Sequence, residues 1–163
     1  MSLPLLGSAS CVLDSKRRLT LPAKLREELG LAESGSPVVI TIGQGGCLYL
    51  FTPETWNQFS PPIFKAVIQG DPKAIRLRTL LAKYGSTPRT DRNGRVSLTE
   101  GQMGFAGIQK QLVVFPSWNR VELWSPERFE ATYPSATSPA EVDELMAHVD
   151  ASVSPRKEGD PPA

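Results

Sequence analysis

Short stretches in which apolar and polar residues alternate recur along the chain, a pattern typical of half-buried β-strands. Residues 11–13 form the first stretch and residues 18–21 the second, with Leu19 and Leu21 on one face. The polar segment between them, residues 14–17, predicts a tight turn. Together these patterns predict a β-hairpin near the start of the chain.

The same stretch of chain continues with a predicted helix, a second hairpin and a second helix. Pro22 suits the first turn of a helix, and Gly30 is a typical C-terminal stop. Residues 38–42 and 47–51 are predicted as the strands of a hairpin around GQGG. Thr52 can cap the short helix that follows it. The predicted order is therefore ββαββα.

This order of elements repeats further along the chain. DSKRRLTLPAKLREELGL from Asp14 resembles DRNGRVSLTEGQMGFAGI from Asp91 at an offset of 77 residues. CLYLFTPETWNQF from Cys47 resembles RVELWSPERFEAT from Arg120 at an offset of 73. The contraction falls between strand pairs, where loops tolerate changes of length. The middle helix of the second copy is expected to be weaker, because each of its glycines costs roughly 1 kcal/mol relative to alanine.

These patterns divide the chain into a first repeat, a connecting segment, a second repeat and a tail, at residues 8–59, 60–86, 87–133 and 134–163. The connecting segment carries two amphipathic stretches that predict helices. The tail predicts one short helix from Ala140 to Val149 and disorder in its last ten residues. A repeat of about 45 residues buries too little surface alone, so the two copies are expected to pack as a pseudo-twofold pair.

Composition and charge narrow the class of protein. A chain of 163 residues that is 40% hydrophobic and 21% charged fits a small soluble protein without a membrane span. The first 95 residues carry 13 basic and 7 acidic side chains, whereas the remainder carry 5 basic and 10 acidic ones. This division favours one part that faces a polyanion, beside the plainer alternative of uneven surface charge. No basic region precedes the apolar run at the amino terminus, so a cytoplasmic location is expected.

Residues that could carry catalysis or bind metal are few. Cys11 and Cys47 lie beside apolar residues in predicted strands, where cysteine behaves as a small buried hydrophobe. The single histidine, His148, is far from both in sequence, so zinc-ligand spacing is absent. GQGG is better explained as a hairpin loop than as a phosphate-binding loop. We therefore expect no enzymatic activity, cofactor, metal or small-molecule substrate.

The duplicated motif points to a known family. Two D-x-x-x-R motifs lie 77 residues apart, and each copy closes with an aromatic residue, Ser or Thr, and Pro. Over roughly residues 8–133 this pattern resembles the MraZ family of bacterial regulators, which is built from tandem SpoVT-AbrB domains. The resemblance implies a mostly β, α+β fold in which two swapped-hairpin AbrB-like repeats pack as a pseudo-twofold β-barrel.

The resemblance also implies a function and partners. The expected partners are double-stranded DNA, bound at repeated sites in the promoter of the protein's own division and cell-wall gene cluster, and further copies of the chain in a ring. A nucleoid-associated location and no membrane partner follow from this function. The alternative is a ring-forming assembly or protein-binding module without operator recognition, in line with two departures from the family pattern. Arg17 replaces a glycine, which is expected to reshape the first turn, and Thr99 replaces a common proline.

The basic residues of the motif regions are the candidate DNA contacts, because their donors reach phosphates and guanine edges. They are Lys16, Arg17, Arg18, Lys24, Arg26, Arg92 and Arg95. Asp14 and Asp91 are expected to pin the turns, since a carboxylate facing phosphate would repel it. The plainer alternative is a turn solvated by charge. Arg76 and Arg78 are equally compatible with a wider positive field and with salt bridges between subunits.

Overall fold

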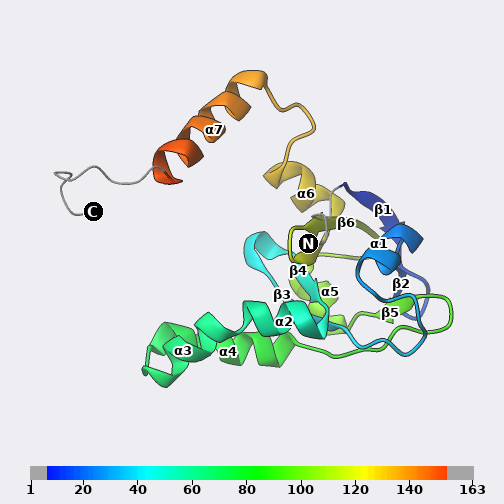
Figure 1. Ribbon diagram of the computed structural model, residues 1–163. Coiled ribbons are helices and arrows are strands. Elements are labelled where there is room, and N and C mark those ends of the chain that lie inside the picture. Colours follow the sequence, from blue (N-terminus) through cyan, green and yellow to red (C-terminus); the bar gives the residue numbers. More distant parts are fainter. Residues whose placement is uncertain (1–6, 154–163) are drawn as a thin grey trace. The chain divides into compact units, whose positions relative to one another are not determined.

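The computed structural model describes residues 7–153 and shows an α+β fold with a mostly antiparallel sheet (Figure 1). The chain divides after Thr132 into two compact units, and the second unit contains a single helix in its described part. The disorder expected for residues 154–163 lies outside the described residues. Between residues 7 and 153, no helix combines the length and apolar composition needed to span a membrane.

Strands and short helices alternate along the first unit. Its first half contains β1 (Ala9–Val12), β2 (Arg18–Thr20), α1 (Ala23–Glu28), β3 (Val39–Ile42), the 3-10 turn η1 (Gln44–Gly46), β4 (Leu48–Phe51) and α2 (Pro53–Phe59). The connecting helices are α3 (Pro61–Ile68) and α4 (Pro72–Tyr84). The second half contains β5 (Arg95–Ser97), α5 (Glu100–Ala106), β6 (Gln111–Ser117), β7 (Arg120–Trp124) and α6 (Pro126–Thr132).

The strands form two separate sheets. The larger sheet has the order β1-β6-β7-β4-β3, and the smaller one pairs β2 with β5. All of these pairs are antiparallel. The predicted hairpin of β3 and β4 is confirmed. The expected mostly β barrel is wrong: the fold is α+β, and among the described strands the larger sheet stays open instead of closing into a barrel.

The predicted hairpin of the first two strands is wrong in its pairing. The turn between them forms, but β1 pairs with β6 and β2 pairs with β5, both from the second half of the unit. Local alternation predicts a strand and the face it buries, but it does not specify the partner strand. The two halves therefore exchange strands, and neither half has a complete sheet of its own.

The register in the small sheet is reciprocal. Arg18 lies opposite Ser97, and Thr20 lies opposite Arg95. In the sequence alignment of the two motifs, Arg18 corresponds to Arg95 and Thr20 to Ser97. Exchanging the two halves therefore converts one of these pairs into the other. The Leu19–Val96 pair, whose two residues are themselves aligned, lies between them.

The larger sheet shows the same reciprocity. Leu48 lies opposite Leu123 and Leu50 opposite Val121, with the Tyr49–Glu122 pair at the centre. The edge pairing of β1 with β6 also has a counterpart, since the segment before the second motif forms bridges with the β3 region. These bridges join Ile40 to Ser86 and Pro37 to Arg89.

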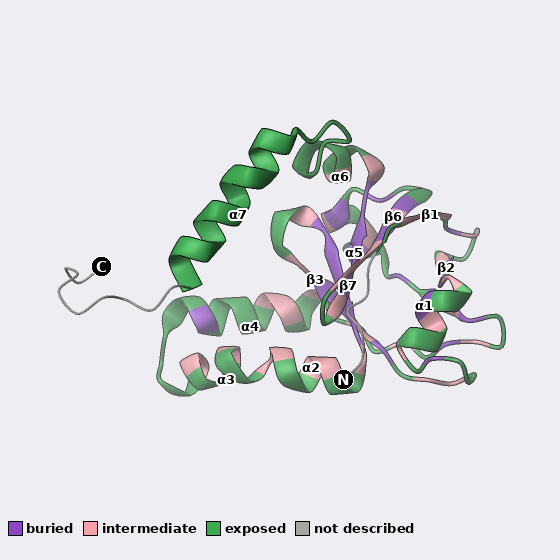
Figure 2. Cartoon of the chain, turned by 45° about the horizontal axis from the view of Figure 1, so that its top comes forward, coloured by how far each residue is buried: buried purple, intermediate pink, exposed green. Residues whose placement is uncertain are grey.

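One apolar core joins the two halves. Leu19 and Leu21 from the first motif region are fully buried, and Val96 and Leu98 from the second are nearly so. They belong to one continuous cluster with the inner faces of the larger sheet, which is the buried centre in Figure 2. Burying one such side chain contributes roughly 1.5–3 kcal/mol, so the shared core holds the two motif turns in place.

Helix α5, which is expected to be weak, is well formed because side chains cap the backbone N–H groups at its N-terminus. Thr99 and Gln102 make a reciprocal capping box at the N-terminus. The Gln102 side chain is buried, and its Nε2 lies within 3.1 Å of the carbonyl oxygens of Ile40 and Tyr84 and of the Ser86 hydroxyl. Thr99 in place of a proline is therefore a capping residue.

Helices α2 and α4 each begin with a side-chain cap. Thr52 and Thr55 form a capping box on α2, and the Asp71 carboxylate accepts hydrogen bonds from the first backbone N–H groups of α4. The tail helix, α7, runs over Pro139–Val153 and is longer than the predicted Ala140 to Val149. Residues 150–153 contain no glycine or proline that would end it earlier.

Candidate nucleic-acid interface

The first motif turn is organised by its aspartate. Asp14 Oδ1 accepts hydrogen bonds from the backbone N–H groups of Lys16 and Arg18, both at 2.9 Å. Its Oδ2 accepts a hydrogen bond from Arg18 Nε at 2.6 Å. The carboxylate therefore binds both the backbone of the turn and the guanidinium that closes the motif.

The second motif turn repeats this arrangement bond for bond. Asp91 Oδ1 accepts hydrogen bonds from the backbone N–H groups of Asn93 and Arg95 at 2.9 Å, and Oδ2 accepts one from Arg95 Nε at 2.7 Å. Arg95 Nη1 also lies 3.6 Å from Asp14 Oδ2, in the first turn. The pairing of β2 with β5 thus brings both turns together at one small sheet (Figure 1).

Both carboxylates are held in the ionised form. For Asp14, desolvation raises the pKa, but hydrogen bonds from Arg18 and Lys16 outweigh it and keep the pKa below its ordinary value. For Asp91, the backbone hydrogen bond from Arg95 is the main cause of a lowered pKa. Each aspartate is therefore engaged within its turn at neutral pH.

The turn expected to be reshaped by Arg17 keeps the geometry of the other one. Arg17 has φ of 59°, and the aligned Gly94 has φ of 69°. Each donates its backbone N–H to the carbonyl of the motif aspartate at 3.0 Å. The left-handed conformation disfavours arginine by roughly 1 kcal/mol, and the turn adopts it nonetheless.

Two arginines from different elements occupy equivalent positions beside the turns. Arg17 Nε donates to the carbonyl oxygen of Leu98 at 3.4 Å, and Arg26 Nε donates to that of Leu21 at 3.1 Å. Leu21 and Leu98 are aligned residues, so the two guanidiniums lie at corresponding carbonyls, although both arginines come from the first half. In the second turn Gly94 makes this possible, because a Cβ there would overlap the Arg26 side chain.

Arg17 has a further partner that the sequence did not reveal. Its Nη1 lies 2.9 Å from Glu100 Oε1, at the start of α5. Glu100 directly follows the capping residue Thr99, a position where acidic residues are favoured by the helix dipole, and that signal could have indicated it. Both side chains are largely exposed, so this ion pair contributes little stability.

The remaining candidate residues differ in their exposure to solvent and in whether an aspartate orients them. Lys16 and Arg92 are exposed on the two turns, and Lys24 is exposed on α1, 3.8 Å from Glu28. Arg18 and Arg95 are half-buried and oriented by their aspartates. The structure therefore brings together two rigid guanidiniums and two exposed basic side chains around β2 and β5.

The candidates for metal binding and nucleophilic chemistry were the histidine, cysteine and acidic side chains. No three side chains of the His, Cys, Asp and Glu types lie there close enough to hold a metal ion. Burial, together with the nearby Glu122 carboxylate, raises the pKa of the Cys47 thiol to about 12. A thiol with that pKa does not act as a nucleophile at neutral pH.

Comparison with known proteins places the chain in a family. The family model described as "MraZ protein, putative antitoxin-like" matches residues 5–69. A Parafrankia protein named transcriptional regulator MraZ is 35% identical over 151 residues, covering 92% of this chain and 96% of the relative. A protein of the same name from Treponema denticola is 32% identical over 124 residues, covering 76% and 83%. The chain belongs to the MraZ family.

A further MraZ relative matches most of this chain. The relative of that name from Saccharophagus degradans is 31% identical over 140 residues, which is 86% of this chain and 95% of the relative. The resemblance stated from the two D-x-x-x-R motifs is confirmed.

Proposed function

We propose that this MraZ family member is a DNA-binding transcriptional regulator and that the paired motif turns are its DNA-contacting surface. The observation that carries the proposal is the meeting of two basic turns at the β2–β5 sheet, where each motif arginine is oriented by its own aspartate. A donor whose geometry is fixed before binding loses less entropy when it meets a phosphate or a guanine edge.

The contacts follow from the accessibility of each side chain. Lys16 and Arg92 are exposed and reach phosphates, while Arg18 and Arg95 present their Nη groups from oriented positions. Arg17, Lys24 and Arg26 border the same surface. Asp14 and Asp91 act within the turns and do not face DNA.

A single surface of this size neutralises few phosphates and binds DNA weakly at physiological salt. Assembly of several copies into a ring, presented to repeated sites in the promoter of the protein's own division and cell-wall gene cluster, raises affinity through effective concentration. The site of action is then the nucleoid in the cytoplasm. The names of the MraZ relatives support the regulatory role.

The architecture in this proposal is a pair of AbrB-like repeats, residues 8–59 and 87–133, joined by the connecting segment 60–86 and followed by the tail 134–163. What supports it is the reciprocal register of both sheets, in which paired residues recur with the halves exchanged. An arrangement of this kind is expected when two copies of one unit pack like the subunits of a homodimer.

The test is a fluorescence anisotropy titration with a duplex from the region upstream of the protein's own gene and with a scrambled duplex of equal length and composition. The proposal expects tighter binding to the upstream duplex at equal salt. Light scattering on the same sample reports the oligomer. Equal affinity for both duplexes by an intact oligomer would favour the alternative, an assembly module without operator recognition.

A further inference from the structure

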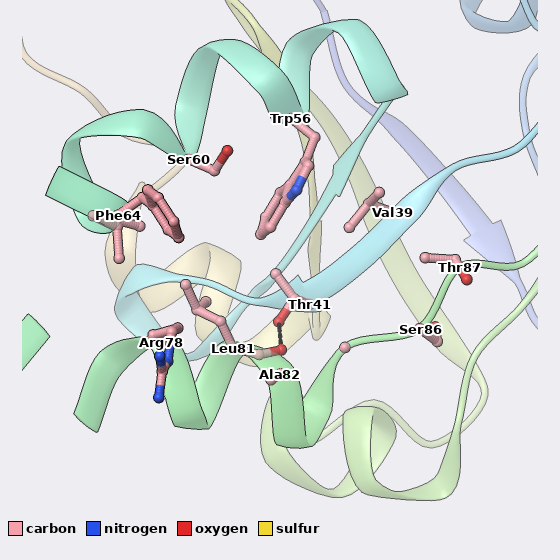
Figure 3. A pocket seen from close by; sticks show the side chains of 12 residues that line it. Val39, Thr41, Trp56, Ser60, Phe64, Arg78, Leu81, Ala82, Ser86 and Thr87 are labelled. Carbon is pink, nitrogen blue, oxygen red and sulfur yellow. Dashed lines mark hydrogen bonds between the residues drawn. The ribbon is translucent and has the colours of Figure 1, made fainter. Parts of the chain in front are cut away.

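An apolar groove lies beside the connecting helices. It encloses about 540 Å³ between α2, α3, α4 and β3. Figure 3 shows Trp56 and Phe64 reaching into it from one side and Leu81 from the other. Phe64 is 62% exposed, and large apolar side chains grouped at a hollow surface mark interaction sites.

The helix that forms one wall of this groove is strongly basic. Within its bounds α4 carries four basic side chains and no acidic one, namely Lys73, Arg76, Arg78 and Lys83. Of these four side chains, Arg78 lines the groove itself, next to Leu81 and Ala82 (Figure 3), and the other three lie elsewhere on α4. A partner for this groove would therefore combine an apolar ridge with acidic edges.

The helix α7 has this combination. Its large apolar side chains are exposed and fall on one face, at spacings of three and four residues: Val142, Leu145, Met146, Val149 and Val153. It also carries four acidic side chains and neither lysine nor arginine. Figure 2 shows α7 exposed along its whole length. Amphipathic helices of this type bind by laying the apolar face into a groove.

We propose that α7 of one copy docks its apolar face into the groove between α3, α4 and β3 of a second copy, with its acidic edges against α4. The two surfaces are different parts of one chain and are complementary in charge. A contact between two different surfaces is heterologous, and repetition of such a contact around an axis closes a ring. The inference specifies the interface for the ring in the proposed function and rests on that assembly.

The first test measures the oligomer of the full-length protein. Leu145→Glu places a charge on the apolar face of α7, and Ala151→Glu places the same charge on its opposite face as a control. Light scattering is expected to give a monomer mass for Leu145→Glu and the wild-type mass for Ala151→Glu. Wild-type mass for Leu145→Glu would overturn the proposal.

Anisotropy with a short duplex separates this inference from the DNA-binding proposal. A monomeric Leu145→Glu protein that still prefers the upstream duplex supports both. If wild-type protein shows no preference but Leu145→Glu still loses the oligomer, the docking stands and the regulatory proposal fails.

The second test establishes which chain supplies the helix. Full-length Met146→Cys and Phe64→Cys proteins, carrying tags of different length, are mixed and oxidised, with wild-type protein as the background for Cys11 and Cys47. The proposal expects a disulfide-linked species containing one chain of each length. A chain that carries both substitutions is oxidised in parallel. If the mixed species is absent and this chain forms an internal disulfide, α7 docks on its own chain and the proposal is overturned.

Discussion

Each motif aspartate accepts three hydrogen bonds within its own turn, and this accounts for its place in a surface proposed to meet DNA. The bonds to two backbone N–H groups fix the turn, and the bond to the arginine Nε fixes the guanidinium. The sequence predicts that the aspartates pin the turns and that the basic residues meet DNA, because carboxylate and phosphate repel. The hydrogen bonds show how each aspartate can hold its turn, and the DNA contact of the basic residues stays a prediction.

The lowered pKa of Asp14 predicts an acid-sensitive contribution to stability. Because its folded-state pKa lies below the ordinary value of about 3.9, the ionised carboxylate stabilises the fold at neutral pH, and this contribution is lost as pH falls through the folded pKa. Asp14→Asn is expected to lower the melting temperature at pH 7 and to reduce its decline between about pH 5 and pH 2. Thermal denaturation followed by circular dichroism measures both. An Asp14→Asn curve parallel to that of the wild type would contradict the assignment.

Arg17→Gly separates backbone strain from DNA contact. Glycine relieves about 1 kcal/mol of positive-φ strain but removes the exposed ion pair to Glu100 and the 3.4 Å hydrogen bond to the Leu98 carbonyl, so stability is expected to change by less than about 1 kcal/mol. If the guanidinium meets a phosphate, the log–log salt slope of DNA binding becomes shallower by about 0.9. Urea denaturation and anisotropy at several salt concentrations measure the two effects. A variant with the wild-type slope would exclude Arg17 from the contact.

The strands and helices show where sequence reasoning succeeds and where it stops. The β3–β4 hairpin, the Thr52 cap of α2 and the helix after the second motif follow from local chemistry and are present. The partners of β1 and β2 were mispredicted because alternation carries no information about which strand lies alongside. The Arg26 contact beside Gly94 was missed for the same reason, since it depends on the packing of the two halves.

Gln102 is expected to be the most sensitive polar residue of α5. It caps the helix and supplies N–H groups to acceptors in two other segments, so its removal leaves buried acceptors unpaired. Gln102→Ala is predicted to lower the free energy of unfolding by about 2–3 kcal/mol in urea titrations. Gln109→Ala, at an exposed position seven residues later, should change it by less than about 0.5 kcal/mol. Equal effects of the two substitutions would show that the Gln102 network is not stabilising.

At the level of the complete chain, the internal repeat was the most informative sequence feature. Its two offsets predicted which residues correspond, and the paired residues in both sheets follow those offsets. The ion pair of Arg17 with Glu100 and the position of Arg26 beside Gly94 were not predicted, because Glu100 and Arg26 lie outside the motifs. The basic first half of the sequence contains the first motif turn of the proposed DNA surface and the basic helix α4. The acidic second half contains α7, which is proposed to dock beside α4 of another copy.

The proposed role of the paired turns is tested most directly by removing one exposed basic side chain from each. The substitutions are Lys16→Ala and Arg92→Ala in one chain, with Lys65→Ala on α3 as a control, since α3 lies at the opposite end of the first unit from β2 and β5 (Figures 1 and 2). Anisotropy titrations of the upstream duplex over a range of salt concentrations give affinity and slope. The double variant is predicted to bind at least about 10-fold more weakly, with a slope shallower by about 1.8, while Lys65→Ala and both melting temperatures stay at wild-type values. Wild-type affinity and slope in the folded double variant would contradict the assignment of the DNA surface to the motif turns.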